Sequence, residues 1–276
     1  MRRTIIRPPA VFWLLVFTGA VAALQAAELR PATLQSFERY VRATEARMNS
    51  ERGDQFLWID RLPADRRAEM TKLFDRGEVV VEKLETKESG RSLDIPDGMV
   101  HHWVSAAFIP GATLSQAIAL AQDYDHHAEV FQPAVARSRL IRRNGNTFLV
   151  AFRFVQKRVI TVVTDVESEA RFERLDPSRV EARVYATRIA EVEHAFSPDE
   201  RVVPPDEGHG YLWRMNTYCR FVQRAGGVVI EFESLSLSRD LPIGIGWIVR
   251  PFVTSVPKES LVFTLQTYVK KLGRRA

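Results

Sequence analysis

Histidine is the residue type in this 276-residue chain with the most evident chemical potential, and six histidines occur in it. His101-His102 lies in a run that alternates like a strand, so the two side chains point to opposite faces and cannot bind one ion together. His126-His127 are adjacent on a predicted helix, whereas helical metal ligands are spaced four residues apart. His194 and His209 stand alone in the sequence. We therefore predict no metal site and no cofactor.

The usual motifs of nucleophilic and phosphate chemistry are absent from the sequence. There is no Gly-x-Ser-x-Gly elbow and no glycine-rich phosphate loop. The serines of Ser234–Ser238 lie along a predicted strand. Arg239-Asp240 comes just before Pro242, where it could orient a polar group of a ligand or form a salt bridge that holds the loop. We predict no catalytic residue from these patterns.

Cys219 is the single cysteine, so an intramolecular disulfide is excluded. It stands in a stretch in which apolar residues alternate with polar ones. This setting favours a buried structural thiol over a reactive one.

The middle of the chain, from Pro133 to about Leu237, reads as a series of strands. Turns are predicted at Asn144-Gly145, Asp176–Ser178 and Ala225–Gly227. One-sided alternation in successive hairpins predicts an antiparallel sheet with one apolar and one solvated face. The apolar rows contain Phe148, Val150, Phe152, Phe154, Val180, Ala182, Val184, Ala186, Trp213, Met215, Thr217, Cys219, Phe221, Val228, Ile230 and Phe232.

The C-terminal segment is the only long helix left to cover that apolar face. It is predicted to begin near Pro257, because proline suits a first helical turn. Its apolar residues Leu261, Leu265, Tyr268 and Leu272 form one stripe. The segment Leu241–Ser255 before it reads as a loop that carries Trp247 and Phe252.

The N-terminal part of the chain divides into a leader and an extension. Residues 1–27 have a basic start, an apolar run and small residues, as in a cleaved signal peptide, which predicts export to the periplasm or the extracellular space. Residues 28–98 form a mostly helical extension, and residues 99–276 the main domain. Removing the three leader arginines lowers the net charge from +5 to +2, which argues against a nucleic-acid partner.

The order of one strand, two short helices, a run of antiparallel strands and a long amphipathic helix resembles the START-like (SRPBCC, Bet v 1-like) superfamily. The resemblance covers residues 99–272 as a fold and 33–272 as a pattern similar to secreted bacterial members. The stretches that carry it are Phe56–Trp58, Val80–Leu84, His101–Trp103, Phe108–Leu114, Gln122–Asp125, Ser236–Pro242, Gly246-Trp247 and Pro257–Leu261. It implies an α+β helix-grip fold, a curved antiparallel sheet wrapped around a long C-terminal helix.

The resemblance also implies a cavity between the sheet and the C-terminal helix, holding a hydrophobic or lipid-like molecule. The expected ligand-binding residues are Phe152, Phe154, Val184, Trp213, Met215, Thr217, Ile230, Phe232, Trp247, Phe252, Leu261, Leu265 and Tyr268. Transient contact with an anionic membrane is a further expectation. It comes from two basic runs, Arg137, Arg139, Arg142 and Arg143 on one strand and Lys270, Lys271, Arg274 and Arg275 at the end of the chain. Two alternatives remain open: a cyclase-like enzyme using Tyr268, Arg239 or Asp240, and a filled core whose extension binds a partner.

Overall fold

The computed structural model describes residues 28–157, 160–240 and 246–273, without the side chains of residues 246–254. The predicted signal peptide lies outside the described residues. None of the helices in the part of the chain described is long and apolar enough to cross a membrane.

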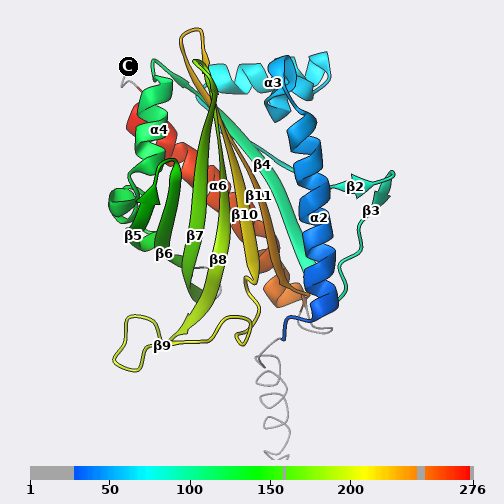
Figure 1. Ribbon diagram of the computed structural model, residues 1–276, viewed down its shortest axis with the longest axis vertical. Helices are drawn as coiled ribbons and strands as arrows, with labels where there is room; N and C mark the ends of the chain where they lie inside the picture. Colours follow the sequence, from blue (N-terminus) through cyan, green and yellow to red (C-terminus); the bar gives the residue numbers. More distant parts are fainter. Residues whose placement is uncertain (1–27, 158–159, 241–245, 274–276) are drawn as a thin grey trace, which may run out of the picture.

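A long antiparallel sheet forms the body of the structure (Figure 1). Its strands follow the order β1-β4-β11-β10-β8-β7-β6-β5, and β9 pairs with the end of β8. The first long strand therefore pairs with the last one, whereas β5 to β8 are joined by successive hairpins. The bounds are β1 Val80–Lys83, β4 Gly98–Pro110, β5 Val135–Asn144, β6 Thr147–Lys157, β7 Thr161–Asp176, β8 Arg179–Glu193, β9 Arg201–Val202, β10 Arg214–Arg224 and β11 Gly227–Arg239.

The predicted turns join neighbouring strands where the sequence places them. Asn144 pairs with Thr147 across the β5–β6 turn, Asp176 with Arg179 across the β7–β8 turn, and Arg224 with Gly227 across the β10–β11 turn. Gly145 and Gly226 have φ values of +57° and +80°, which a glycine adopts at little cost. The turn chemistry thus sets the register of these hairpins.

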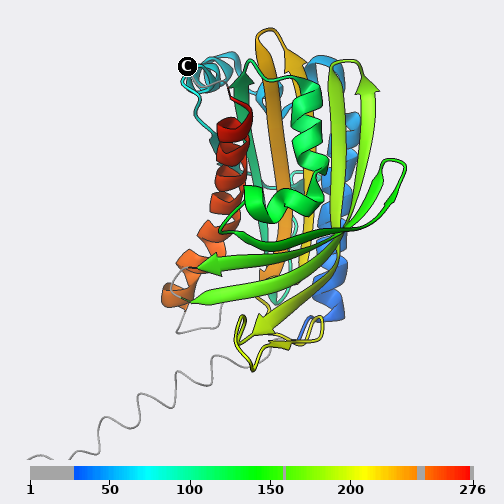
Figure 2. The same ribbon diagram turned by 90° about the vertical axis from the view of Figure 1, so that its left-hand side faces the viewer.

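Helices lie on both faces of the sheet (Figures 1 and 2). α6 covers one face, where α4 and the short η4 and α5 close one end, whereas α2, η2, η3 and α3 cover the opposite face. The helical bounds are α2 Pro31–Ser50, η2 Gly53–Gln55, η3 Trp58–Arg61, α3 Ala64–Asp75, α4 Leu114–Gln122, η4 Tyr124–His126, α5 His127–Val130 and α6 Gly246–Leu272. A separate small hairpin pairs β2 Lys87–Glu88 with β3 Arg91–Ser92.

The prediction of one solvated sheet face is wrong for the central strands. Arg220, Glu231 and Glu233 occupy the polar positions of β10 and β11, yet each is at most 4% exposed. The N-terminal extension covers them, and its apolar residues form two clusters with the sheet. Alternation identifies which residues share a face, but it cannot tell whether a charged face is covered by another part of the chain.

The extension also contributes a strand. β1 is an edge strand that pairs with β4, Val80 lying opposite Ala106. The division into an extension and a main domain at residue 98 stays a prediction. β1 belongs to the predicted extension but pairs with β4 of the predicted main domain.

α6 begins at Gly246, so the prediction of a loop up to Ser255 and a helix start near Pro257 is wrong. Proline disfavours a helix interior because it lacks the N–H group, but packing can outweigh that preference. Val256 packs with Val162, Met99 and Tyr211 at this end of the sheet, which supports the early helical turns. The side chains of Trp247 and Phe252 lie outside the described part of the structure.

The C-terminal part of α6 carries the stripe that the sequence predicts. Leu261, Leu265 and Tyr268 are 7%, 0% and 3% exposed. They pack with residues of the sheet, including Ile230 and Phe232, in the largest apolar cluster. The helix-grip prediction is thereby confirmed: an antiparallel sheet carries the long C-terminal helix on one apolar face.

Replacing Leu265 with alanine should destabilise the protein by about 2–5 kcal/mol, because the lost contacts and the remaining cavity both weaken a fully buried site. Urea unfolding followed by circular dichroism measures this change. Gln266→Ala, on the exposed side of the same helix, is the matched control and should change the unfolding free energy little. Equal effects of the two substitutions would contradict the placement of α6.

Candidate functional site

Part of the face beneath α6 is less completely enclosed than the rest of it. Ile230 and Phe232 of β11 are buried, whereas the predicted site residues Phe152, Phe154, Val184, Met215 and Thr217 keep part of their surface accessible. Phe152 stacks on Phe154 with ring centroids 5.3 Å apart and on His127 at 5.9 Å. Aromatic and apolar surface therefore stays accessible on the side of the sheet that α6 covers.

Cys219 shows how deep this accessible surface lies. It is on β10, paired with Ala182 of β8 and Phe232 of β11, near the centre of the sheet. Burial raises the pKa of its thiol to about 12, yet the side chain is not fully enclosed. Because Cys219 keeps accessible surface at this position, the face beneath α6 is the candidate ligand site. The prediction of a structural thiol agrees with the raised pKa, since the thiolate is the reactive form.

The other end of this face carries hydroxyl groups and one histidine. His101 Nε2 lies 2.9 Å from Ser238 Oγ. Burial, and to a smaller extent the charge of Lys83, lowers the pKa of His101 to about 4, so its ring is neutral at physiological pH. Ser234 and Ser236 lie on the same face of β11, because they alternate with Leu235 and Leu237 of the opposite face.

Trp213 does not lie with the other predicted site residues. It packs with Phe37 and Leu237 beneath α2. β10 begins at Arg214, so the alternation that predicted Trp213 does not extend to it. Gly210 permits this placement: its φ is +74°, and a Cβ there would lie 2.9 Å from the Trp213 ring. The predicted residues Leu261, Leu265 and Tyr268 do meet Ile230 and Phe232 in one cluster.

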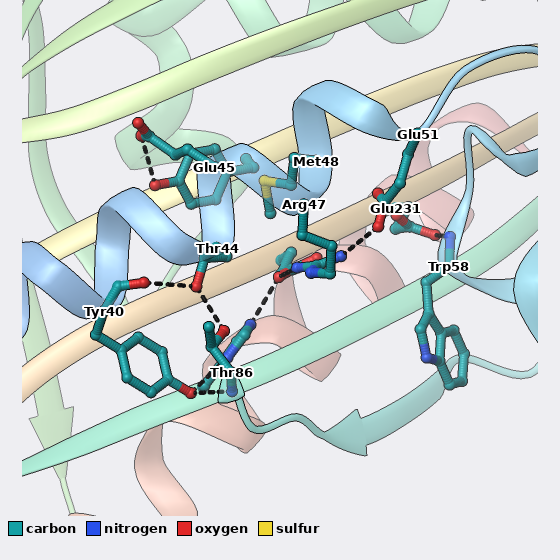
Figure 3. Close-up of polar contacts among 12 residues, drawn as sticks. Tyr40, Thr44, Glu45, Arg47, Met48, Glu51, Trp58, Thr86 and Glu231 are labelled. Carbon is teal, nitrogen blue, oxygen red and sulfur yellow. Dashed lines mark hydrogen bonds and ion pairs between the residues drawn. The ribbon is translucent and has the colours of Figure 1, made fainter. Parts of the chain in front are cut away.

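Beneath α2, buried charged residues join the extension to the sheet (Figure 3). Glu51 lies at their centre: its Oε2 accepts a hydrogen bond from Arg220 at 2.7 Å and its Oε1 one from Arg47 at 2.6 Å. Arg61 pairs with the same carboxylate, and Arg47 also pairs with Glu233. We call these residues, Arg47, Glu51, Arg61, Arg220, Glu231 and Glu233, the ionic cluster.

Glu231 is a member of the ionic cluster whose pKa is strongly shifted. Burial and the charge of Glu233 raise its pKa to about 7, although the charge of Arg220 opposes this shift. Its Oε2 accepts the backbone N–H of Trp58 at 2.7 Å, whereas Oε1 has no hydrogen bond. For Glu233, burial is the largest single influence and raises the pKa. The hydrogen bond from His102 and the charge of Arg47 lead the opposing effects, and the net pKa is lowered.

Tyr40, His102 and Glu233 form a hydrogen-bonded chain next to the ionic cluster. Tyr40 Oη lies 2.9 Å from His102 Nδ1, and His102 Nε2 lies 2.6 Å from Glu233 Oε1. The backbone N–H of Thr86 donates to Tyr40 Oη at 2.7 Å, so the tyrosine can donate its proton to Nδ1. His102 is 2% exposed, and among the described residues no serine or cysteine side chain is hydrogen-bonded to these three side chains. These geometries support a role in holding α2 and not one in catalysis.

Sequence reasoning missed this cluster, although one sign of it was present. The buried residues of α2 are Thr33, Phe37, Tyr40, Thr44 and Met48, which follow helical spacing with polar groups included. Apolar spacing alone predicts one inner face with Leu34, Phe37, Val41 and Met48. Phe37 and Met48 are buried, whereas Leu34 and Val41 are only partly buried. Arg47 and Glu51 were also spaced to pair on one helix face.

Arg239 supports the loop-holding interpretation of the Arg239-Asp240 pair. Its Nη1 donates to the carbonyl of His209 at 3.3 Å, in the loop before β10. The same loop is held by Glu191, which accepts from the backbone N–H and Nδ1 of His209 at 2.8 and 2.9 Å. Among the described residues, no group of histidine, cysteine and acidic side chains is arranged to hold a metal ion.

A separate surface pocket of about 370 Å³ lies between the extension and the β7–β8 and β10–β11 hairpins. Its arginines already have protein partners: Arg179 donates to the Gly53 carbonyl at 2.8 Å, Arg224 to Asp60 at 2.6 Å and Arg67 to the Asp60 carbonyl at 3.1 Å. This pocket is therefore a weaker candidate site than the face beneath α6.

The raised pKa of Glu231 predicts a pH dependence of stability. Because its folded pKa of about 7 exceeds the ordinary value of 4.5, the folded protein holds this proton more strongly than the unfolded chain. The resulting stabilisation is complete below pH 4.5 and is lost as the pH rises through 7. The unfolding free energy of the wild type minus that of Glu231→Gln should fall by roughly 3 kcal/mol between pH 4.5 and 8.

Urea unfolding at several pH values measures this difference. Glu169→Gln, at an exposed position of β7, is the control and should follow the wild type across the range. Parallel curves for the wild type and Glu231→Gln would contradict the assignment.

Comparisons with known proteins place these features in context. No protein-family model matches the chain, and no curated protein matches its sequence. Among solved structures, the STAR-related lipid transfer protein fragment 25–204 from Xanthomonas axonopodis is 14% identical over 67% of this chain and 98% of its own, with a TM-score of 0.42. Human STARD10 is 11% identical over 76% of this chain and 83% of its own, with a TM-score of 0.43. The ZhuI aromatase/cyclase from Streptomyces sp. R1128 is 11% identical over 63% of this chain and 94% of its own, with a TM-score of 0.42. These structures come from the superfamily that the sequence resembles, and at such distances they indicate no ligand and no activity.

Proposed function

We propose that this protein is an exported binding protein that holds a hydrophobic or lipid-like molecule between the sheet and α6. The observation that carries the proposal is the accessible surface that Cys219, Val184, Thr217 and Phe152 keep on the covered side of the sheet. Burial of apolar ligand surface there would contribute about 25 cal/mol per Å². Export rests on the leader predicted for residues 1–27.

A cyclase-like enzyme receives less support from this face. General acid–base catalysis needs a titratable group near its working pKa. Burial raises the pKa of Tyr268 well above its ordinary value, and Arg239 is bonded to the loop that contains His209. Among the described residues, the acid–base pair with the closest contact, His102 with Glu233, lies on the opposite face, beneath α2.

A tryptophan in place of Val184 should fill part of the proposed cavity and weaken binding of a hydrophobic fluorophore by about tenfold or more, because the ligand and the indole compete for one space. Titration with 1-N-phenylnaphthylamine measures the dissociation constant. Thr187→Trp, at an exposed position of the same strand, is the control and should bind like the wild type. Failure of the wild-type protein to bind any hydrophobic probe would contradict the proposed function.

Loading from an anionic membrane is part of the same proposal. The edge strand β5 exposes Arg137, Arg139, Arg142 and Arg143, and Ile141 among them is 40% exposed. An apolar side chain flanked by arginines suits the interface of an anionic bilayer, where each basic residue contributes about 1 kcal/mol. A carrier of hydrophobic molecules needs such contact, since its ligand is held in membranes.

Replacing both Arg139 and Arg142 with glutamate should weaken binding to phosphatidylglycerol vesicles by about tenfold or more, because attraction becomes repulsion at two positions. Cosedimentation with vesicles measures the bound fraction, and phosphatidylcholine vesicles should retain little of either protein. The double variant Arg171→Glu, Arg174→Glu, at exposed positions of β7, is the control with the same change in net charge. Unchanged binding of the double variant would rule out β5 as the contact surface.

A further inference from the structure

We infer that the ligand site beneath α6 selects an uncharged molecule that has a hydrogen-bonding group, such as a hydroxyl or carbonyl, at one end of an apolar body. This inference rests on the proposed function and adds the chemical class of the ligand. It comes from the polar side chains on the inner face of the sheet and from their charge.

A row of hydroxyl groups runs along the inner face of β11. Ser234, Ser236 and Ser238 are spaced by two residues and therefore point the same way. Ser234 pairs across the sheet with Thr217 of β10, and Ser236 pairs with His101 of β4. Ile230 and Phe232, earlier on the same face of β11, belong to the apolar cluster. One strand thus presents an apolar end followed by a polar end to a molecule lying along it.

Several of these hydroxyls are available to a ligand. Ser238 Oγ is bonded to His101 Nε2, but the hydroxyls of Ser234, Ser236 and Thr217 have no hydrogen-bond partner within the described part of the structure. Ser236 is only 5% exposed. None of these three hydroxyl oxygens is among the fully buried atoms that lack a hydrogen bond, so each has accessible surface. A hydroxyl in so buried a position is expected to bond with a molecule that occupies the space.

Four titratable side chains that the structure describes on this face are uncharged at physiological pH. Burial lowers the pKa of His101 to about 4, and burial raises the pKa values of Cys219, Tyr124 and Tyr268, each of which keeps its proton. Lys83 of the edge strand β1 pairs with Trp103 and so belongs to the same face, but its side chain is exposed to solvent at the edge of the sheet. Glu191 is acidic and is bonded to His209, so it gives no support to an anion.

An ionised head group beside these hydroxyls would lose its water without gaining a buried cationic partner in the part of the chain that the structure describes. That loss is much more costly than the burial of a hydroxyl or carbonyl, which the free serine and threonine hydroxyls can satisfy. The lining therefore discriminates between a long-chain alcohol and the corresponding carboxylate, two molecules with almost the same apolar surface.

The test compares dodecanol, dodecanoate and dodecane, each displacing 1-N-phenylnaphthylamine from the full-length mature protein at pH 8. We expect dodecanol to bind at least about tenfold more tightly than dodecanoate, because only the carboxylate buries a charge. The double variant Ser236→Ala, Thr217→Val should lose about five- to tenfold in affinity for dodecanol and nothing for dodecane, since only the alcohol loses hydrogen bonds. Thr187→Val, at an exposed position, is the matched control.

The outcomes separate the two proposals. Tighter binding of dodecanoate, or an equal loss for dodecanol and dodecane in the double variant, would overturn this inference while the hydrophobic site stands. Absence of displacement by all three molecules, together with no binding of the fluorophore, would refute the proposed function and this inference with it.

Discussion

The burial of one apolar stripe of α6 against the sheet is the constraint on which the rest of the structure depends. Leu261, Leu265 and Tyr268 complete a cluster to which β4, β6, β7, β8, β10 and β11 all contribute. Without this helix the concave face of the sheet would expose its apolar rows to water. The same contact leaves the centre of the face partly open near Cys219, so the element that stabilises the fold also bounds the proposed ligand site.

The ionic cluster serves the opposite face in a different way. A buried ion pair adds little net stability, because desolvation of its charges offsets their attraction. What it provides is a specific fit: Glu51 at the end of α2 meets arginines from α2, η3 and β10, so a shifted or rotated helix would leave several charges without partners. The extension is therefore held in one position against the sheet, and the strands that carry the proposed site are supported from behind.

Local sequence patterns predicted the strands, the turns and the stripe of α6, because these depend on neighbouring residues. Asn144-Gly145 and Leu261–Tyr268 are examples in which chemistry and spacing determine the local structure. The patterns failed where distant parts of the chain decide the environment. The alternation predicts Glu231 and Glu233 on a solvated face, but the N-terminal extension covers them. It also predicts Trp213 as part of β10, which begins one residue later. Whether the core is open depends on packing in three dimensions, which no spacing rule describes.

The pairing of β4 with β11 has a consequence for biogenesis. Residues such as Ala107 and Ile230 become neighbours only after more than a hundred intervening residues have been synthesised. Native contacts of such high contact order slow folding, because chain entropy is lost before the contacts form. A growing chain therefore cannot complete its sheet on the ribosome before its C-terminal quarter emerges. The long strands made first must therefore wait, with an open edge, for a partner that the ribosome supplies near the end of synthesis.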